Sequence, residues 1–90
     1  MDKTRIAVAG AGYIGQAHID VAQNSPTCVL SAIVDPSPAA VAVAAKAGVP
    51  LYTSLDELLS KDRPDGLILA TPNHLHVTQG LQCIAAKLPI

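Results

Sequence analysis

The 90-residue sequence contains no Trp, no Phe and only two Tyr, so large aromatic side chains contribute little to its core. Half of the residues are nevertheless hydrophobic, and a core of Ala, Val, Ile and Leu suits helices packed closely on both faces of a parallel sheet. Only 14% of the residues are charged, which is typical of a compact globular chain and excludes a disordered one. The length allows one domain at most.

The sequence also lacks a basic cluster and a long apolar run. Its six Lys and Arg residues are scattered and the net charge is −1, which argues against nucleic acid as a partner. The longest apolar run, residues 39–45, is far too short to cross a bilayer. We therefore expect no membrane association and a cytoplasmic location.

The two cysteines and three histidines do not form a metal site. Cys28 and Cys83 have neither a C-x-x-C spacing nor the Cys/His spacing of a zinc site, so we expect two buried free thiols. His74 and His76 are close together, but no carboxylate or cysteine with suitable spacing joins them. His18 falls one turn into a predicted helix, where packing or hydrogen bonding is a simpler function than catalysis.

Four apolar segments alternate with four helical ones, a pattern that predicts an α/β protein with a doubly wound parallel sheet in the order 3-2-1-4. Pro89-Ile90 resembles the start of a fifth strand, so we expect the chain to stop before that strand. The predicted strands are residues 5–9, 28–34, 50–52 and 66–70. The predicted helices are residues 14–24, a segment from a Ser37-Pro38 start to Gly48, a short one capped by Ser54 and Glu57, and one after residue 73.

Apolar spacing predicts which faces of the first and last helices are buried. The stripe expected in the first helix is Ile14, Ala17, Val21 and Ala22. The stripe expected in the last helix is Val77, Leu81, Ile84 and Ala85.

A G-x-G-x-x-G motif joins the first strand to the first helix. Gly10 permits a tight turn, Gly12 leaves room for phosphates, and Gly15 lets the helix lie close to the strand. The helix start supplies unpaired N–H groups and partial positive charge, so a pyrophosphate needs no lysine or arginine there. The motif alone is weak, because such a turn also occurs for packing only.

Asp35 strengthens this interpretation because it ends the second strand, 20 residues after Gly15. A carboxylate there can accept hydrogen bonds from the adenosine ribose of a dinucleotide. It would repel a 2′-phosphate, and no Arg or Lys occurs in residues 36–43, so NAD is favoured over NADP. The alternative for Asp35 is a turn-forming residue before proline, and Ser37 either contacts a phosphate or caps the next helix.

The segment Thr71-Pro72-Asn73-His74-Leu75-His76 follows the fourth strand. In the predicted order, the first and fourth strands flank the point where the crossover direction reverses, so this segment and the glycine loop line one crevice. Asn73 either caps the last helix or bonds the cofactor.

These motifs together resemble the glucose-fructose oxidoreductase/inositol dehydrogenase/MocA (Gfo/Idh/MocA) family. The resemblance covers all 90 residues, and its most specific part is the T-P-N-x-x-H pattern of residues 71–76. Further matching segments are Gly10-Ala11-Gly12-Tyr13-Ile14-Gly15 with His18, Asp35-Pro36, and Tyr52-Thr53-Ser54-Leu55 before Glu57-Leu58-Leu59.

The resemblance implies a Rossmann fold and an NAD(P)-dependent oxidoreductase acting on a sugar, cyclitol or related polyol. It implies that Tyr13, Ile14, Thr71, Pro72, Asn73 and His76 join the glycines and Asp35 at the cofactor site. It also implies that residues 1–90 are the N-terminal part of a longer protein that forms homo-oligomers. The family's catalytic lysine, in a Glu-Lys-Pro motif, and its substrate domain would lie beyond Ile90, so we expect no catalytic residue in this chain. A non-catalytic module that senses dinucleotides remains the alternative.

Overall fold

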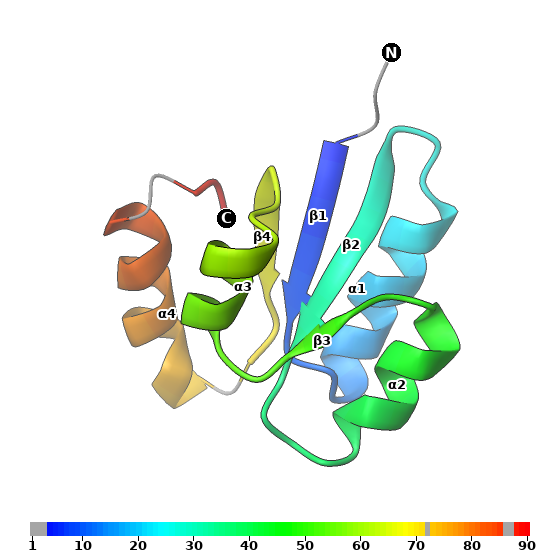
Figure 1. Ribbon diagram of the computed structural model, residues 1–90, viewed down its shortest axis with the longest axis horizontal. Helices are drawn as coiled ribbons and strands as arrows, with labels where there is room; N and C mark the ends of the chain where they lie inside the picture. The colour runs from blue at the N-terminus through cyan, green and yellow to red at the C-terminus, as the bar shows by residue number, and fades with distance from the viewer. Residues whose placement is uncertain (1–3, 72, 86–87) are drawn as a thin grey trace.

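The computed structural model describes residues 4–71, 73–85 and 88–90, with residues 73–78 described in their backbone only. Within these ranges, four parallel strands form one sheet in the order β3-β2-β1-β4, as predicted (Figure 1). The strands are β1 (Thr4–Ala9), β2 (Cys28–Val34), β3 (Leu51–Tyr52) and β4 (Gly66–Leu69). The helices are α1 (Tyr13–Asn24), α2 (Ala40–Ala47), α3 (Leu55–Lys61) and α4 (Asn73–Ala85).

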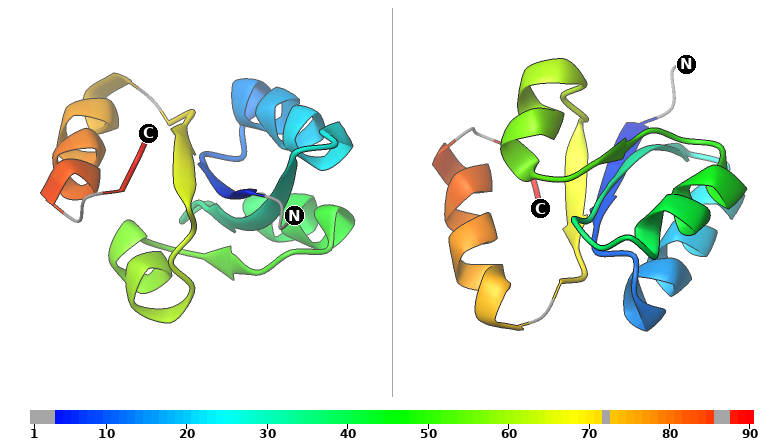
Figure 2. Two further views of the ribbon diagram at one scale, coloured as in Figure 1. Left: turned by 90° about the horizontal axis from the view of Figure 1, so that it is seen from above. Right: turned by 60° about the horizontal axis from the view of Figure 1, so that its bottom comes forward.

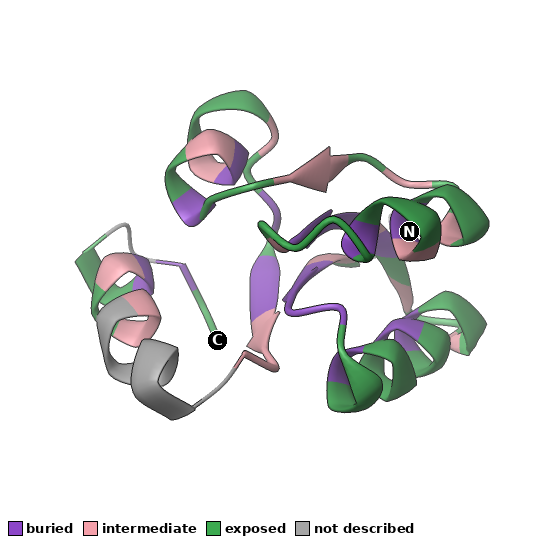
Figure 3. Cartoon of the chain, turned by 90° about the horizontal axis from the view of Figure 1, so that it is seen from below, coloured by how far each residue is buried: buried purple, intermediate pink, exposed green. Residues whose placement is uncertain are grey.

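The sheet separates two apolar clusters. On one face, α1 and α2 pack through Ile19, Ala22 and Ala40 onto side chains such as Val8 and Ile33. On the other face, the fully buried Leu58 of α3 and Cys83 of α4 pack against side chains that include Ala9 and Val34. Figure 2 shows one helix pair on each side of the sheet, and Figure 3 shows the buried residues gathered along the strands between them. The α/β doubly wound prediction is confirmed.

The buried face of α1 differs from the prediction. Ile14 and Val21 are 59% and 69% exposed, and Ala17 is exposed as well, whereas the buried residues are Gly15, Ile19 and Ala22. Of the predicted stripe, only Ala22 is correct. The reason is steric, because only the side of α1 that carries Gly15, which has no Cβ, can pack against the carbonyl oxygen of Gly10 in the preceding loop.

The buried face of α4 was also predicted wrongly. Leu81 and Ile84 are 61% and 67% exposed, Ala85 is exposed, and the side chain of Val77 lies outside the described residues. The face turned inward instead carries the fully buried Cys83, with Gln79 and Gln82 half-buried. Polar partners on neighbouring elements hold this rotation: Gln79 bonds Thr71, and Gln82 bonds Asp56.

Helix ends agree with the sequence signals more closely. Ser54 caps α3 by accepting the N–H of Glu57 at 3.2 Å, as predicted, although the Glu57 carboxylate accepts the N–H of Thr53 and not that of Ser54. Gly48 ends α2 with a left-handed φ of 73°. The start of α2 was predicted two residues too early, because Ser37 heads a tight turn in which Ala40 N–H bonds the Ser37 carbonyl.

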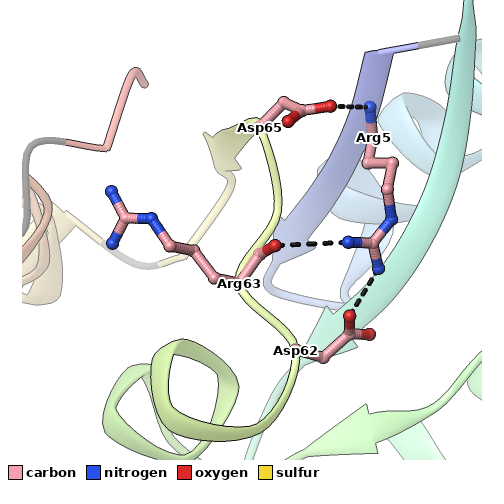
Figure 4. Close-up of polar contacts among 4 residues, drawn as sticks. All are labelled: Arg5, Asp62, Arg63 and Asp65. Carbon is pink, nitrogen blue, oxygen red and sulfur yellow. Dashed lines mark hydrogen bonds and ion pairs between the residues drawn. The ribbon is translucent and has the colours of Figure 1, made fainter. Parts of the chain in front are cut away.

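A polar cluster joins β1 to the segment between α3 and β4, at the end of the sheet away from the glycine loop (Figure 4). The Arg5 guanidinium bonds the Asp62 carboxylate and the Arg63 carbonyl, and the Arg5 N–H donates to Asp65 Oδ2 at 2.7 Å. The hydrogen bond to Asp62 raises the pKa of Arg5 further above its ordinary value. The cluster sets where β4 begins beside β1.

The outer side of β4 is partly covered. The N–H of Leu67 donates to the carbonyl of Pro89 at 2.9 Å, and Leu88 is buried. Residues 86–87 lie outside the described residues.

Both cysteines are free, Cys83 buried and Cys28 only half-buried, so the prediction of buried thiols is confirmed for Cys83 alone. None of the helices in the described ranges has the length and apolar character that a membrane crossing requires.

Candidate functional site

A cleft of about 740 Å³ opens at the carboxyl ends of the strands, the lower end of the sheet in Figure 1. It draws its walls from five parts of the chain: the β1–α1 loop, the end of β2, the β3–α3 connection, the end of β4 and helix α4. Its lining residues are Gly10, Gly12, Tyr13, Ile14, Val34, Asp35, Pro36, Ser37, Thr53, Ser54, Leu55, Ala70, Thr71, Gln79 and Gln82.

The cleft brings together most of the residues that the sequence singled out. Gly10, Gly12, Tyr13, Ile14, Asp35 and Thr71 all line it. Gly15 lies behind the lining. Pro72 and the side chains of Asn73 and His76 lie outside the described residues.

The three motif glycines have different physical functions. Gly10 has a φ of 106°, and a Cβ there would lie 2.6 Å from the Ala70 carbonyl oxygen. A Cβ on Gly15 would lie 1.9 Å from the Gly10 carbonyl oxygen. Gly12 differs, because a Cβ there would meet nothing within 4 Å. Gly10 and Gly15 are therefore needed for packing, whereas the bare backbone of Gly12 faces open space in the cleft.

The start of α1 is electrically suited to an anion. Gly12 is the N-cap residue, no side chain caps the helix, and no acidic residue lies in its first turn. The first N–H groups of a helix have no intrahelical acceptor and carry partial positive charge. An anionic group against Gly12 would meet these donors without displacing a side chain.

Asp35 fastens the end of β2 to the glycine loop. Its Oδ2 accepts the N–H of Ala11 at 2.8 Å, and its Oδ1 accepts the N–H of Ser37 at 2.7 Å. The second bond is the turn that the sequence left open as an alternative. The first bond gives no signal in the sequence, because it depends on β2 lying beside β1. A carboxylate has about four acceptor positions, so two remain for a ligand.

The opposite wall contains polar residues that the sequence analysis missed. Thr71 donates its hydroxyl proton to Gln79 Oε1 at 2.5 Å, and Gln82 Nε2 lies 3.4 Å from Asp56 Oδ1. No motif marks these glutamines, and their place in the cleft follows from the rotation of α4.

His18 lies on the exposed side of α1, so the structure does not support the packing function considered for it. Among the residues that the structure describes, no group of three or more His, Cys, Asp or Glu side chains is placed to hold a metal ion.

The order of the strands, the bare loop at the first crossover and the carboxylate at the end of β2 define a dinucleotide-binding domain of the Rossmann type. The sequence profile of an oxidoreductase family, described as having an NAD-binding Rossmann fold, matches residues 4–90. The chain belongs to this family, the Gfo/Idh/MocA oxidoreductases, as the resemblance had indicated.

Three relatives illustrate the similarity. The chain is 31% identical over its whole length to the rhizopine catabolism protein MocA of Rhizobium meliloti, covering 28% of that protein. It is 39% identical over 84 residues to the 4-carboxy-2-hydroxymuconate-6-semialdehyde dehydrogenase of a Sphingobium species, covering 91% of this chain and 27% of the relative. The crystal structure of the WlbA dehydrogenase of Bordetella pertussis in complex with NADH and UDP-GlcNAcA superposes with a TM-score of 0.87 at 34% identity, over 96% of this chain and 25% of that one. The chain thus spans about a quarter of the length of these relatives.

Proposed function

We propose that residues 1–90 are the N-terminal, NAD-binding part of an oxidoreductase that transfers a hydride between a nicotinamide cofactor and a sugar, cyclitol or related polyol. The observation that carries the proposal is the open backbone of Gly12 beside the uncapped start of α1, in the same cleft as the Asp35 carboxylate. In this proposal the substrate domain and the proton-transferring residue lie outside these 90 residues.

The cofactor's pyrophosphate would lie against Gly12 and the first N–H groups of α1, where Tyr13 and Ile14 also line the cleft. Gly10 and Gly15 would hold that loop in shape, as their close contacts support. The other half of the cofactor would lie along the end of β4. There Thr71 lines the cleft, and we assign Pro72, Asn73 and His76 to the same region from the family motif.

Asp35 would accept hydrogen bonds from the adenosine ribose hydroxyls through the acceptor positions that Ala11 and Ser37 leave available. A 2′-phosphate at that ribose would meet the carboxylate charge with no Arg or Lys in residues 36–43 to offset it. We therefore propose that NAD is preferred to NADP.

The bound nicotinamide would supply the hydride acceptor or donor, and this chain would supply the orientation of the cofactor. The sugar-nucleotide ligand in the WlbA structure supports a polyhydroxylated substrate. The 90 residues alone are expected to turn over no substrate. We further propose that the full-length protein is a cytoplasmic homo-oligomer, which its free thiols and its exposed apolar side chains, such as Leu81 and Ile84, support.

Titration calorimetry of the full-length protein with NAD and with NADP tests the cofactor assignment. We expect heat of binding with NAD and an affinity for NADP at least about tenfold lower. Reduction of NAD is then followed at 340 nm with a panel of inositols and sugars. No binding of either cofactor would refute the proposal, and binding without turnover on any polyol would favour the dinucleotide-sensing alternative.

A further inference from the structure

The side of α4 that faces the cleft is unusually polar for an inward face. Gln79 and Gln82 line the cleft, whereas Leu81 and Ile84 are more than half exposed. A helix on a protein surface ordinarily turns its apolar stripe inward, because burial of apolar area stabilises the fold. Gln79 and Gln82 give this side of the cleft hydrogen-bonding groups that can meet polar atoms of a ligand.

The bond between Thr71 and Gln79 has a defined direction. Thr71 has one hydroxyl proton, and it is donated to Gln79 Oε1 at 2.5 Å. The Thr71 oxygen can therefore act only as an acceptor towards anything else that it contacts. Among the described residues, the Gln79 side-chain nitrogen has no acceptor, so it remains available as a donor.

We infer that Gln79 is a positioning residue that sets the polarity of Thr71 and thereby selects a hydrogen-bond donor on the nicotinamide-riboside half of the cofactor. The inference rests on the proposed function, which directs that half of the cofactor to the end of β4. Two groups on that half have the required chemistry, the ribose hydroxyls and the carboxamide N–H. Without Gln79, the Thr71 hydroxyl proton has no acceptor in the part of the chain that the structure describes, so a bound cofactor that excludes water leaves this donor unpaired.

Three variants of the full-length protein test this inference. Gln79→Leu removes the acceptor, and we expect NAD affinity to fall about fivefold, the effect of one net hydrogen bond. Gln79→Glu keeps an acceptor for the Thr71 proton, and we expect NAD affinity within about twofold of the parent. Gln23→Leu is the matched control, because Gln23 is an exposed glutamine of α1 that bonds the Ala47 carbonyl far from the cleft.

A double-mutant cycle separates positioning from a merely structural effect. Thr71→Val removes the hydroxyl and nearly preserves the shape of the side chain. If Gln79 acts through Thr71, the double variant Thr71→Val/Gln79→Leu binds NAD about as weakly as the weaker single variant. Additive losses would overturn the inference.

Calorimetry with NAD, ADP-ribose and ADP identifies which group of the cofactor donates a hydrogen bond to Thr71. If the donor is a ribose hydroxyl, Gln79→Leu weakens NAD and ADP-ribose alike, and if it is the carboxamide, the variant weakens NAD alone. Either result supports the inference, provided that ADP affinity is unchanged. An equal loss for ADP, or no loss for NAD, would overturn it. Failure of the parent protein to bind NAD would instead refute the proposed function, so the two failures are distinguishable.

Discussion

Replacing Asp35 with asparagine separates the charge of this side chain from its shape. Both carboxylate oxygens accept backbone N–H groups, from Ala11 in the glycine loop and from Ser37 in the following turn. Asparagine has one acceptor oxygen and one NH₂ group, so in either orientation its NH₂ faces a backbone N–H donor. One of the two bonds is therefore lost, and the other loses its charge.

The cost can be estimated from these two bonds. A hydrogen bond to a charged group contributes about 1.5–3 kcal/mol, and Asp35 is half-buried, so we expect Asp35→Asn to lower the free energy of unfolding by about 1–2 kcal/mol. Urea unfolding followed by circular dichroism measures this difference. The matched control is Asp20→Asn, which removes the same charge from an exposed position in α1 and is expected to change the free energy of unfolding by less than about 0.5 kcal/mol.

The same position also tests the cofactor assignment. We expect Asp35→Ala to weaken NAD binding about tenfold or more and to reduce the discrimination against NADP, because both the ribose acceptor and the charge are removed. Calorimetry with both cofactors measures these changes. If Asp35→Asn unfolds like the parent and Asp35→Ala keeps both affinities, then Asp35 neither holds the glycine loop nor contacts the ribose, and the reasoning is wrong.

Three further predictions concern other parts of the chain. Gly12→Ala should weaken NAD binding about tenfold and leave the melting temperature unchanged, because a Cβ at this position has free space. Gly15→Ala should lower the free energy of unfolding by more than about 3 kcal/mol, because its Cβ would overlap a carbonyl oxygen; calorimetry and thermal melts check both variants. Burial raises the pKa of the Cys83 thiol above 9.0. The stability that depends on the protonated thiol is therefore complete below pH 9.0 and is lost as the pH rises through the folded-state pKa; urea unfolding of the parent and of Cys83→Ala at pH 7.5 and at higher pH checks this. Arg5→Ala should lower the free energy of unfolding by about 1 kcal/mol, and by less at high salt, because the ion pair with Asp62 is partly exposed to solvent; urea unfolding at two salt concentrations measures this.

Each of these predictions has a contrary outcome. Equal stability losses for the two glycine variants would show that Gly12 is a packing glycine as well. A parent protein whose stability followed that of Cys83→Ala at every pH would remove the thiol as the cause. A loss for Arg5→Ala that did not respond to salt would indicate lost packing of its carbon chain and not the ion pair.

Local signals in the sequence predicted the ends of elements well. The Ser54 cap and the Gly48 terminus lie where the sequence placed them, because a cap is decided by residues three or four positions apart. The strand order followed from the alternation of strands and helices, since crossover connections between parallel strands have one favoured hand. The spacing between Gly15 and Asp35 indicated that the glycine loop and Asp35 line one cleft, because the favoured crossover places the second strand beside the first.

The rotation of the helices was not predictable in this way. Periodicity alone favoured Ile14 and Val21 in α1, and Leu81 and Ile84 in α4, yet all four are exposed. In α1 the glycine contact outweighs the apolar stripe, because a helix cannot approach a backbone carbonyl through a Cβ atom at 1.9 Å.

The sequence by itself determined the fold class, the family and the residues of the glycine loop, since each follows from the order of residues along the chain. Only the tertiary structure decided that Asp35 bonds Ala11 and that Gln79 takes the Thr71 proton. Asp35 and Ala11 are 24 residues apart, and Thr71 and Gln79 lie on different elements. Both contacts therefore depend on how strands and helices pack, and packing is settled by steric fit and hydrogen bonding in the assembled fold.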